Sequence, residues 1–190
     1  MEIEYEAMFK DINKDEIRKK LKDVGARLVK PEFLQKREIF KLGDQDINKW
    51  IRLRDEGDKI TLTYKELLGN AIDSQKELLI IVNDFQKTSK ILEITGLKKI
   101  GFQENNREVW MINNVEIMID SWPFIDPLVE IEGKSEEDVK KTSELLGFDY
   151  NKAIFGSVEI LYSEKYGIDK IKLCNHAPIL KFDMKNPFIK

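Results

Sequence analysis

The sequence predicts an α+β protein built on an eight-stranded antiparallel β-barrel, with helices packed on the outside. Three observations support this fold class. About eight segments alternate apolar with polar residues at period two, which is typical of strands with two different faces. A few other segments carry helix start and stop signals. On the polar faces of the strands, the charges are sorted by sign from one strand to the next.

The alternating segments give the expected strands and the turns between them. Asn113-Asn114 fits a tight hairpin turn, and Glu56-Gly57 fits another. The strands are expected near residues 2–9, 27–41, 48–55, 58–68, 74–83, 99–112, 114–122 and 127–133.

Capping residues mark the expected helices. A helix follows Asn13 and ends near Gly25, and Ser135 with Asp138 forms a capping box at the start of another. The expected helices are 14–25, 84–96, 135–147 and a shorter one at 157–166. The tail, residues 168–190, is expected to be irregular and to pack along the outside. The whole chain, 1–190, is then one domain with its barrel in about 1–165.

Composition excludes several classes of function. The 190 residues carry 32 Lys+Arg against 35 Asp+Glu, a net charge of −3, and a nucleic-acid-binding protein would normally be basic. No apolar run approaches the roughly 18–20 residues that span a bilayer, so no membrane partner is expected. The acidic N-terminus and a single cysteine, Cys174, indicate the reducing cytoplasm. A single histidine, His176, expected at the surface, leaves carboxylates, lysines and arginines to carry any chemistry.

The sorting of charge by strand suggests more than a solvated sheet surface. For any single strand, a polar face in water is the simpler interpretation. A solvated face would mix Lys, Glu, Thr and Ser, however, whereas here acids dominate the first and eighth strands and bases the third and fourth. We therefore expect the polar faces to enclose one cavity and the apolar faces to point outward under the helices. The residues of these two walls are Glu4, Glu6, Glu130, Glu132, Arg52, Arg54 and Lys65.

A cavity with an acidic and a basic wall suits one class of ligand. Clustered carboxylates repel one another unless a hard divalent cation lies between them, and Mg²⁺ or Mn²⁺ prefers oxygen ligands. Arginine and lysine suit phosphate oxygens. A metal–polyphosphate complex would join the two walls.

The order of the motifs along residues 1–165 is specific. The motifs are Glu4-Tyr5-Glu6-Ala7-Met8-Phe9, Trp50-Ile51-Arg52-Leu53-Arg54-Asp55-Glu56-Gly57, Thr61-Leu62-Thr63-Tyr64-Lys65, Lys76-Glu77, Arg107, Asp120-Ser121-Trp122-Pro123, Val129-Glu130-Ile131-Glu132-Gly133 and Gly156-Ser157. In this order they resemble the CYTH superfamily, the triphosphate tunnel metalloenzymes, and most of all its bacterial class IV adenylyl cyclase-like branch. The resemblance implies an eight-stranded antiparallel barrel that forms a tunnel, a divalent metal ion and a triphosphate-containing small molecule as substrate.

The resemblance also implies roles for individual residues. Glu4 and Glu6 match the acids that hold the metal ion, and carboxylates of the far strands complete the site: Glu130, Glu132 and Asp120. The basic residues that bind the triphosphate in the family correspond here to Arg52, Arg54, Lys65 and Arg107. Lys36 or Arg37 is a further candidate for that wall. The superfamily contains adenylyl cyclases, thiamine triphosphatases, inorganic tripolyphosphatases and RNA triphosphatases, and these motifs do not separate them.

One departure from the family pattern is Met8, which stands where the first motif ends in Lys. It is expected to share the inward face of Glu4 and Glu6, and so to leave the phosphate without one charged contact, worth roughly 1.5–3 kcal/mol. Asn105 and Asn106 stand where another basic residue is often found. Two hypotheses follow. The chain is a metal-dependent triphosphate phosphohydrolase or adenylyl cyclase, or it is a catalytically weakened module that binds polyphosphate or nucleotide.

Overall fold

A computed structural model describes residues 1–43, 48–168, 174 and 177–189, and it confirms the predicted fold class. Eight strands follow the order β2-β3-β4-β5-β1-β8-β7-β6, and pairing of β2 with β6 closes the barrel. All of these neighbours are antiparallel. Their bounds are β1 Glu2–Phe9, β2 Arg27–Lys41, β3 Lys49–Asp55, β4 Ile60–Leu67, β5 Gln75–Val82, β6 Lys98–Ile112, β7 Val115–Ser121 and β8 Leu128–Gly133.

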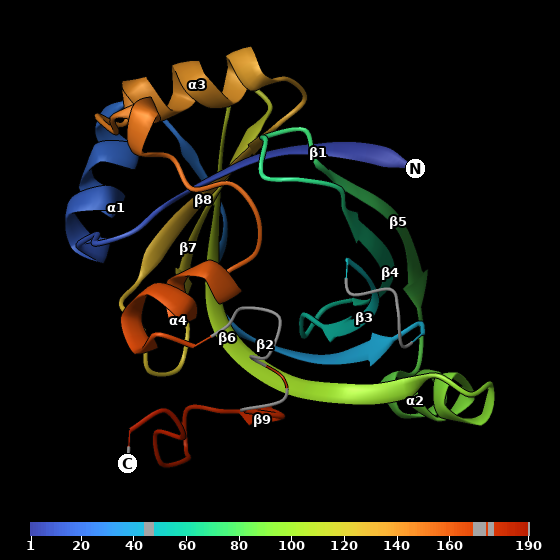
Figure 1. The fold of residues 1–190 in the computed structure, drawn as a ribbon. Coiled ribbons are helices and arrows are strands. Elements are labelled where there is room, and N and C mark those ends of the chain that lie inside the picture. The colour runs from blue at the N-terminus through green and yellow to red at the C-terminus, as the bar shows by residue number, and fades with distance from the viewer. Residues whose placement is uncertain (44–47, 169–173, 175–176, 190) are drawn as a thin grey trace.

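The helices lie outside the ring of strands (Figure 1), and three of them start at side-chain caps, whereas α4 begins two residues later than expected, after Val158, which makes no side-chain cap. Side chains of Asn13, Asp84 and Ser135 accept hydrogen bonds from backbone N–H groups of the first helical turns. The helices are α1 Lys14–Asp23, α2 Phe85–Ile94, α3 Glu136–Leu145 and α4 Glu159–Tyr166, with a 3₁₀ turn, η1, at Tyr150–Lys152. Within the described ranges, no helix is both long and apolar enough to cross a bilayer.

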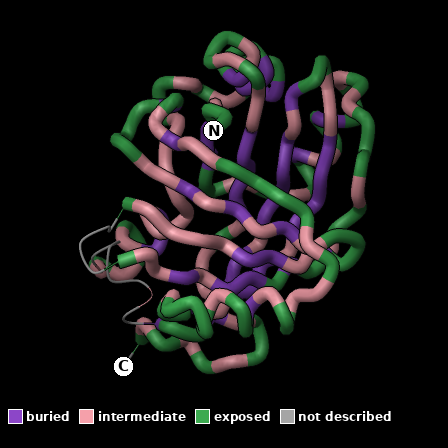
Figure 2. Tube along the Cα trace, turned by 90° about the vertical axis from the view of Figure 1, so that its right-hand side faces the viewer, coloured by how far each residue is buried: buried purple, intermediate pink, exposed green. Residues whose placement is uncertain are grey.

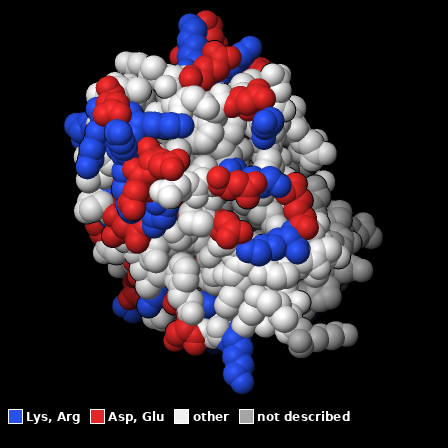
Figure 3. Space-filling view, turned by 90° about the vertical axis from the view of Figure 1, so that its left-hand side faces the viewer, with Lys and Arg blue, Asp and Glu red and all other residues white. Residues whose placement is uncertain are grey.

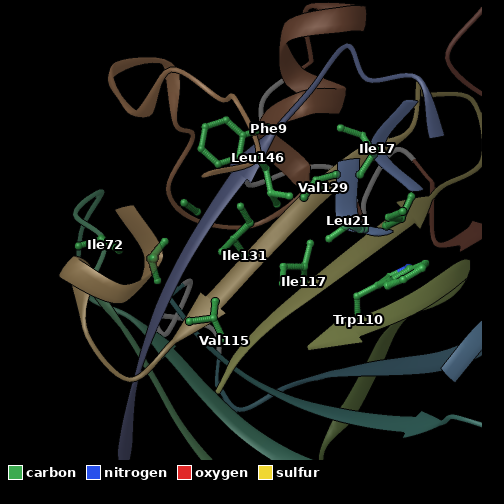
Figure 4. Packing of buried hydrophobic residues seen from close by; sticks show 13 residues of the cluster. Phe9, Ile17, Leu21, Ile72, Trp110, Val115, Ile117, Val129, Ile131 and Leu146 are labelled. Atoms are coloured by element: carbon green, nitrogen blue, oxygen red, sulfur yellow. The ribbon is translucent and has the colours of Figure 1, made fainter. Parts of the chain in front are cut away.

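The main apolar core lies between the barrel wall and the helices α1 and α3 (Figure 4). Outward-facing residues of β1, β7 and β8 alternate with the polar inward-facing ones and pack against this helix pair. Ile117 and Ile131 have no exposed surface, and full burial of such a side chain contributes about 1.5–3 kcal/mol. Because the apolar residues face outward, the interior of the barrel is left to the polar ones.

The helices do not cover the whole outer surface, contrary to the expectation from the sequence. α1 and α3 gather on one side of the barrel, and α2 contacts β3 and β6. The outer face of β5 stays open, with Leu78 57% and Ile80 53% exposed, and Figure 2 shows a long exposed stretch on this side. The period-two pattern predicts which way a side chain points but not which element covers it.

The C-terminal tail differs in one respect from the irregular segment that was predicted. Residues Ile179–Leu180 form a short strand, β9, that pairs in parallel with β6 at Phe102 and Gln103. β6 has an edge free there because its pairing with β7 begins only at Asn106. The tail therefore extends the sheet beside the barrel. Ala177 and Leu180 join a second apolar cluster, called here the Trp122 cluster, which consists of Met8, Trp122, Leu128, Leu161, Tyr162, Ala177 and Leu180.

Charge is distributed differently on the surface and in the interior. On the face that carries α1, α3 and α4, acidic and basic side chains are intermixed (Figure 3). Exposed pairs such as Lys141 with Glu137 and Lys10 with Glu164 contribute little to stability. These helix faces are ordinary solvated surface, whereas the interior keeps acids and bases on separate strands.

Candidate active site

A cavity of about 700 Å³ lies inside the barrel. Most of its charged lining comes from inward-facing positions on the eight strands β1 to β8, because alternate residues of a strand share one face. Among the residues that line it are Glu4, Glu6, Arg37, Arg52, Arg54, Lys65, Glu77, Arg107, Glu116, Glu130 and Glu132. Of the candidate site residues named from the sequence, Asp120, Met8 and Lys36, the alternative to Arg37, do not line this cavity, whereas the others do.

Three carboxylates gather on one wall of the cavity. Glu4 and Glu6 lie two residues apart on β1, and Glu132 of β8 is directly opposite Glu6. Each of the three offers an oxygen, and these oxygens lie within 4.8 Å of one another. An oxygen-only donor set of this size matches what Mg²⁺ and Mn²⁺ prefer.

Among the described residues, only Glu4 of these three carboxylates forms a salt bridge, with Lys65. Burial, followed by repulsion from Glu130, raises the pKa of Glu6 well above its usual value. Burial and the neighbouring charge of Glu4 raise the pKa of Glu132 to about 7. Burial acts against ionisation of Glu4 too, but the charge and hydrogen bond of Lys65, together with Glu77 and Arg52, lower its pKa below the usual value. Two carboxyls that resist ionisation beside a third that is ionised fit a site completed by a divalent cation.

Lys65 connects this cluster to the basic wall. Its Nζ donates to Oε2 of Glu4 at 2.7 Å and lies 3.5 Å from Oε2 of Glu77. Nε2 of Gln75 also donates to Glu4, and lies 3.4 Å from Oε2 of Glu6. Glu4 is therefore held by two donors, Lys65 and Gln75.

Two arginines of β3 continue the basic wall. Burial, with repulsion from Arg54, lowers the pKa of Arg52 to about 10, and its closest carboxylate oxygen, on Glu77, is 4.0 Å away. Arg54 is better compensated, since its Nε and Nη2 lie 2.9 and 2.7 Å from Oε1 of Glu56. Both side chains place positive charge where a polyanion would be stabilised.

Arg107 is bound by two carboxylates, which changes the role expected for Asp120. Its Nε and Nη2 donate to Oδ1 and Oδ2 of Asp120 at 2.8 and 2.5 Å, and Nη2 also donates to Glu130. Despite burial, these acids raise the pKa of Arg107 well above its usual value. Asp120 has no exposed surface and lies outside both the cavity lining and the carboxylate cluster. It positions Arg107, because the register of β6 and β7 places the two residues directly opposite each other.

Met8 requires a second correction. It keeps the parity of Glu4 and Glu6 but does not line the cavity, and it is 1% exposed within the Trp122 cluster. Residues far along the chain account for this burial of Met8. Its backbone exchanges hydrogen bonds with Ile154, in the segment that leads to α4. The thioether therefore packs against apolar neighbours instead of facing the cavity.

The sequence interpretation gave no role to several residues near the site, although Glu77 was quoted within a motif. Glu77 and Gln75 share the inward face of β5, and the β4–β5 register places Glu77 opposite Lys65. The hairpin pairing of two predicted strands could have revealed both. Glu56 was quoted in a turn and at the end of a motif but was given no role, and it accepts hydrogen bonds from Arg54. Cys174 lines the cavity, and burial raises the pKa of its thiol to about 12, whereas His176 lies outside the described residues.

Comparisons with known proteins agree with this geometry. The family model described as "CYTH domain" matches residues 1–154. A protein of Methanocaldococcus jannaschii named "Putative adenylate cyclase" is 27% identical over 152 residues, covering 76% of this chain and 83% of the relative.

Two solved structures share the fold. A candidate adenylate cyclase of Vibrio parahaemolyticus has a TM-score of 0.73 at 12% identity, covering 85% of this chain and 98% of its own. A candidate adenylyl cyclase of Hippeastrum, described as revealing a dominant triphosphatase activity, has a TM-score of 0.57 at 13% identity, covering 90% and 99%.

Proposed function

This chain belongs to the CYTH domain family, and from this premise we propose that it is a divalent-metal-dependent enzyme acting on a triphosphate-containing small molecule. The reaction is triphosphate hydrolysis or adenylyl cyclisation. One observation carries the proposal: a cluster of three carboxylates and a set of arginine and lysine side chains line the same cavity. A metal–triphosphate complex carries both the cation that the acids lack and the oxyanions that the bases would bind.

The acidic and basic walls of the cavity have different proposed roles. Glu4, Glu6 and Glu132 would hold Mg²⁺ or Mn²⁺, which when bound neutralises phosphoryl oxygens and makes phosphorus more electrophilic. Lys65, Arg52 and the other cations bind the remaining oxygens of the triphosphate and stabilise the charge that develops during transfer. Phosphoryl transfer needs little covalent help from the protein, so positioning and charge account for the proposed catalysis.

A substrate panel tests this function. The full chain is incubated with ATP, thiamine triphosphate and inorganic tripolyphosphate, each with Mg²⁺, with Mn²⁺ and with EDTA. Release of phosphate reports hydrolysis, and cyclic AMP with pyrophosphate reports cyclisation. We expect turnover of at least one substrate with metal and none with EDTA.

Two variants test whether the turnover depends on the carboxylate cluster. Glu6→Gln keeps the shape of the side chain while removing its charge, and should abolish the metal-dependent turnover. Glu2→Gln removes an exposed acid from the same face of β1 and serves as the matched control. Binding of a triphosphate without turnover of any would contradict the enzyme and favour the catalytically weakened binding module instead.

A further inference from the structure

One strand of the barrel has an edge that is only partly paired. β4 pairs with β5 along its whole length, whereas β1 pairs with it only at residues 75–77, because β1 begins at Glu2, opposite Glu77. Residues 78–82, called here the β5 edge, therefore have no strand on the side of β1. Among the described residues, no backbone hydrogen bond other than the β4–β5 pairing reaches this segment. Alternate residues of the β5 edge direct N–H and C=O groups toward that open side.

The side chains of the β5 edge are apolar on both faces of the strand. The sequence is Leu78-Leu79-Ile80-Ile81-Val82, and its first four residues are 41–71% exposed. Leu78 and Ile80 point outward on the side of the barrel that no helix covers (Figure 2). A run of strand-forming residues with no charge and no proline is typical of a segment that pairs with another strand.

Two other free edges of the sheet are protected, by contrast. β2 has no pairing with β3 over residues 27–35, and this stretch carries Pro31 and Lys30, whose Nζ donates to the backbone oxygen of Glu56. β6 has β9 paired along its free edge. Proline, lysine and a covering strand are means by which proteins prevent pairing at an edge. The β5 edge has none of these, so we expect a partner strand there.

A second copy of this chain fits the β5 edge by symmetry. Two identical antiparallel strands pair about a two-fold axis, so each edge covers the other and the contact closes. With Ile80 opposite its counterpart, Leu78 is opposite Val82 of the second copy, and apolar residues meet only apolar ones. Moving the axis by one residue in either direction would place Glu77 or Asp84 opposite an apolar residue. The sequence of the edge therefore favours one register.

We propose that this protein forms a two-fold symmetric dimer in which the β5 edges of two copies pair as antiparallel strands and join the two sheets. Backbone hydrogen bonds form along residues 78–82, and the outward side chains of Leu78 and Ile80 are removed from water. Their neighbours on β4, Tyr64 and Leu62, share this outer face and are partly exposed, so the apolar surface extends beyond the edge itself. The dimer does not depend on the proposed function.

Sedimentation velocity of the full chain over a concentration series tests the dimer. Wild type is expected to be mainly dimeric. Leu78→Lys should raise the dimer dissociation constant by about a hundredfold or more, because a two-fold interface carries the change twice and each copy loses the burial of an apolar side chain. Leu145→Lys, on a 50% exposed leucine of α3, is the matched control and should leave the dimer intact. A wild-type protein that is monomeric across the series would overturn the proposal.

A pair of opposite charges tests the register. Val82→Glu alone should weaken the dimer, whereas Leu78→Lys combined with Val82→Glu should restore it, because the proposed register places the ammonium group opposite the carboxylate of the second copy. Leu78→Lys combined with Val82→Lys places like charges opposite each other and should stay monomeric. An opposite-charge double variant that is no more dimeric than its single variants would overturn the pairing.

Ile80→Lys provides an independent variant at the axis itself. The side chain is 53% exposed in the single copy, so its circular dichroism spectrum should match that of wild type. The two introduced charges would lie directly opposite each other, so this variant should be monomeric at concentrations at which wild type is dimeric. A dimer that survives both Ile80→Lys and Leu78→Lys would lie elsewhere on the molecule and would overturn the proposal.

Discussion

Nζ of Lys65 lies 2.7 Å from Oε2 of Glu4, so the basic and acidic walls of the cavity are bonded to each other. Both side chains are less than one-tenth exposed, which strengthens their attraction. A metal ion at Glu4 and a phosphate at Lys65 would each have to replace this contact. The ion pair helps to keep Glu4 ionised and holds both side chains in place.

Glu4→Gln should have opposite effects on the two ligands. Mn²⁺ affinity, measured by calorimetry, should fall by about tenfold or more because one anionic ligand is lost. Triphosphate affinity in EDTA should rise, because Lys65 no longer has Glu4 as a competing anion. Glu2→Gln is the control for the loss of a negative charge. A fall in both affinities would show that Glu4 does not restrain Lys65.

The pKa of Glu132 gives a pH dependence of stability. Its folded value of about 7 lies above the ordinary 4.5, so between these values the folded protein binds more protons than the unfolded chain. Raising the pH through this window therefore destabilises the metal-free protein, by at most about 1.4 kcal/mol per pH unit for this group.

Melting temperatures at pH 5, 6, 7 and 8 test this dependence. The melting temperature of Glu132→Gln should rise relative to that of wild type as the pH increases. Mg²⁺ should stabilise the wild type more at pH 8 than at pH 5, because protons no longer compete for the site. A gap that stays constant over this range would refute the raised pKa.

Asp120→Asn tests the reassignment of Asp120 from metal ligand to positioning residue. Loss of its charge weakens a buried ion pair with Arg107, so the free energy of unfolding should fall by about 2 kcal/mol. Mn²⁺ affinity should stay close to that of wild type, unlike in Glu6→Gln. A comparable loss of Mn²⁺ affinity in both variants would return Asp120 to the metal site.

Met8→Lys should destabilise the protein, because it places an ammonium group in the apolar Trp122 cluster. We expect a loss of about 2–4 kcal/mol in urea denaturation, which is typical of burying a charge without a designed partner. Met8→Leu, similar in volume and uncharged, should cost less than about 1.5 kcal/mol. Unchanged stability with tighter triphosphate binding in Met8→Lys would mean that position 8 reaches the cavity.

The sequence by itself determined which residues face the interior. Period-two alternation in β1, β3 and β8 placed Glu4, Arg52 and Glu132 on one side of their strands, and the sorting of charge indicated that these faces enclose a common space. Such local patterns are reliable because successive side chains of a strand point to opposite faces whatever the rest of the chain does.

Only the tertiary structure decided which inward-facing residues touch one another. Asp120 bonds to Arg107 because of the β6–β7 register, and Met8 is covered by residues about 150 positions further along the chain. Arg37 keeps neutral partners because Gln35 and Asn105 meet beside it when β2 pairs with β6. Alternation along a strand fixes the face to which each side chain points. These contacts depend instead on strand register and on distant segments, which a local pattern does not encode.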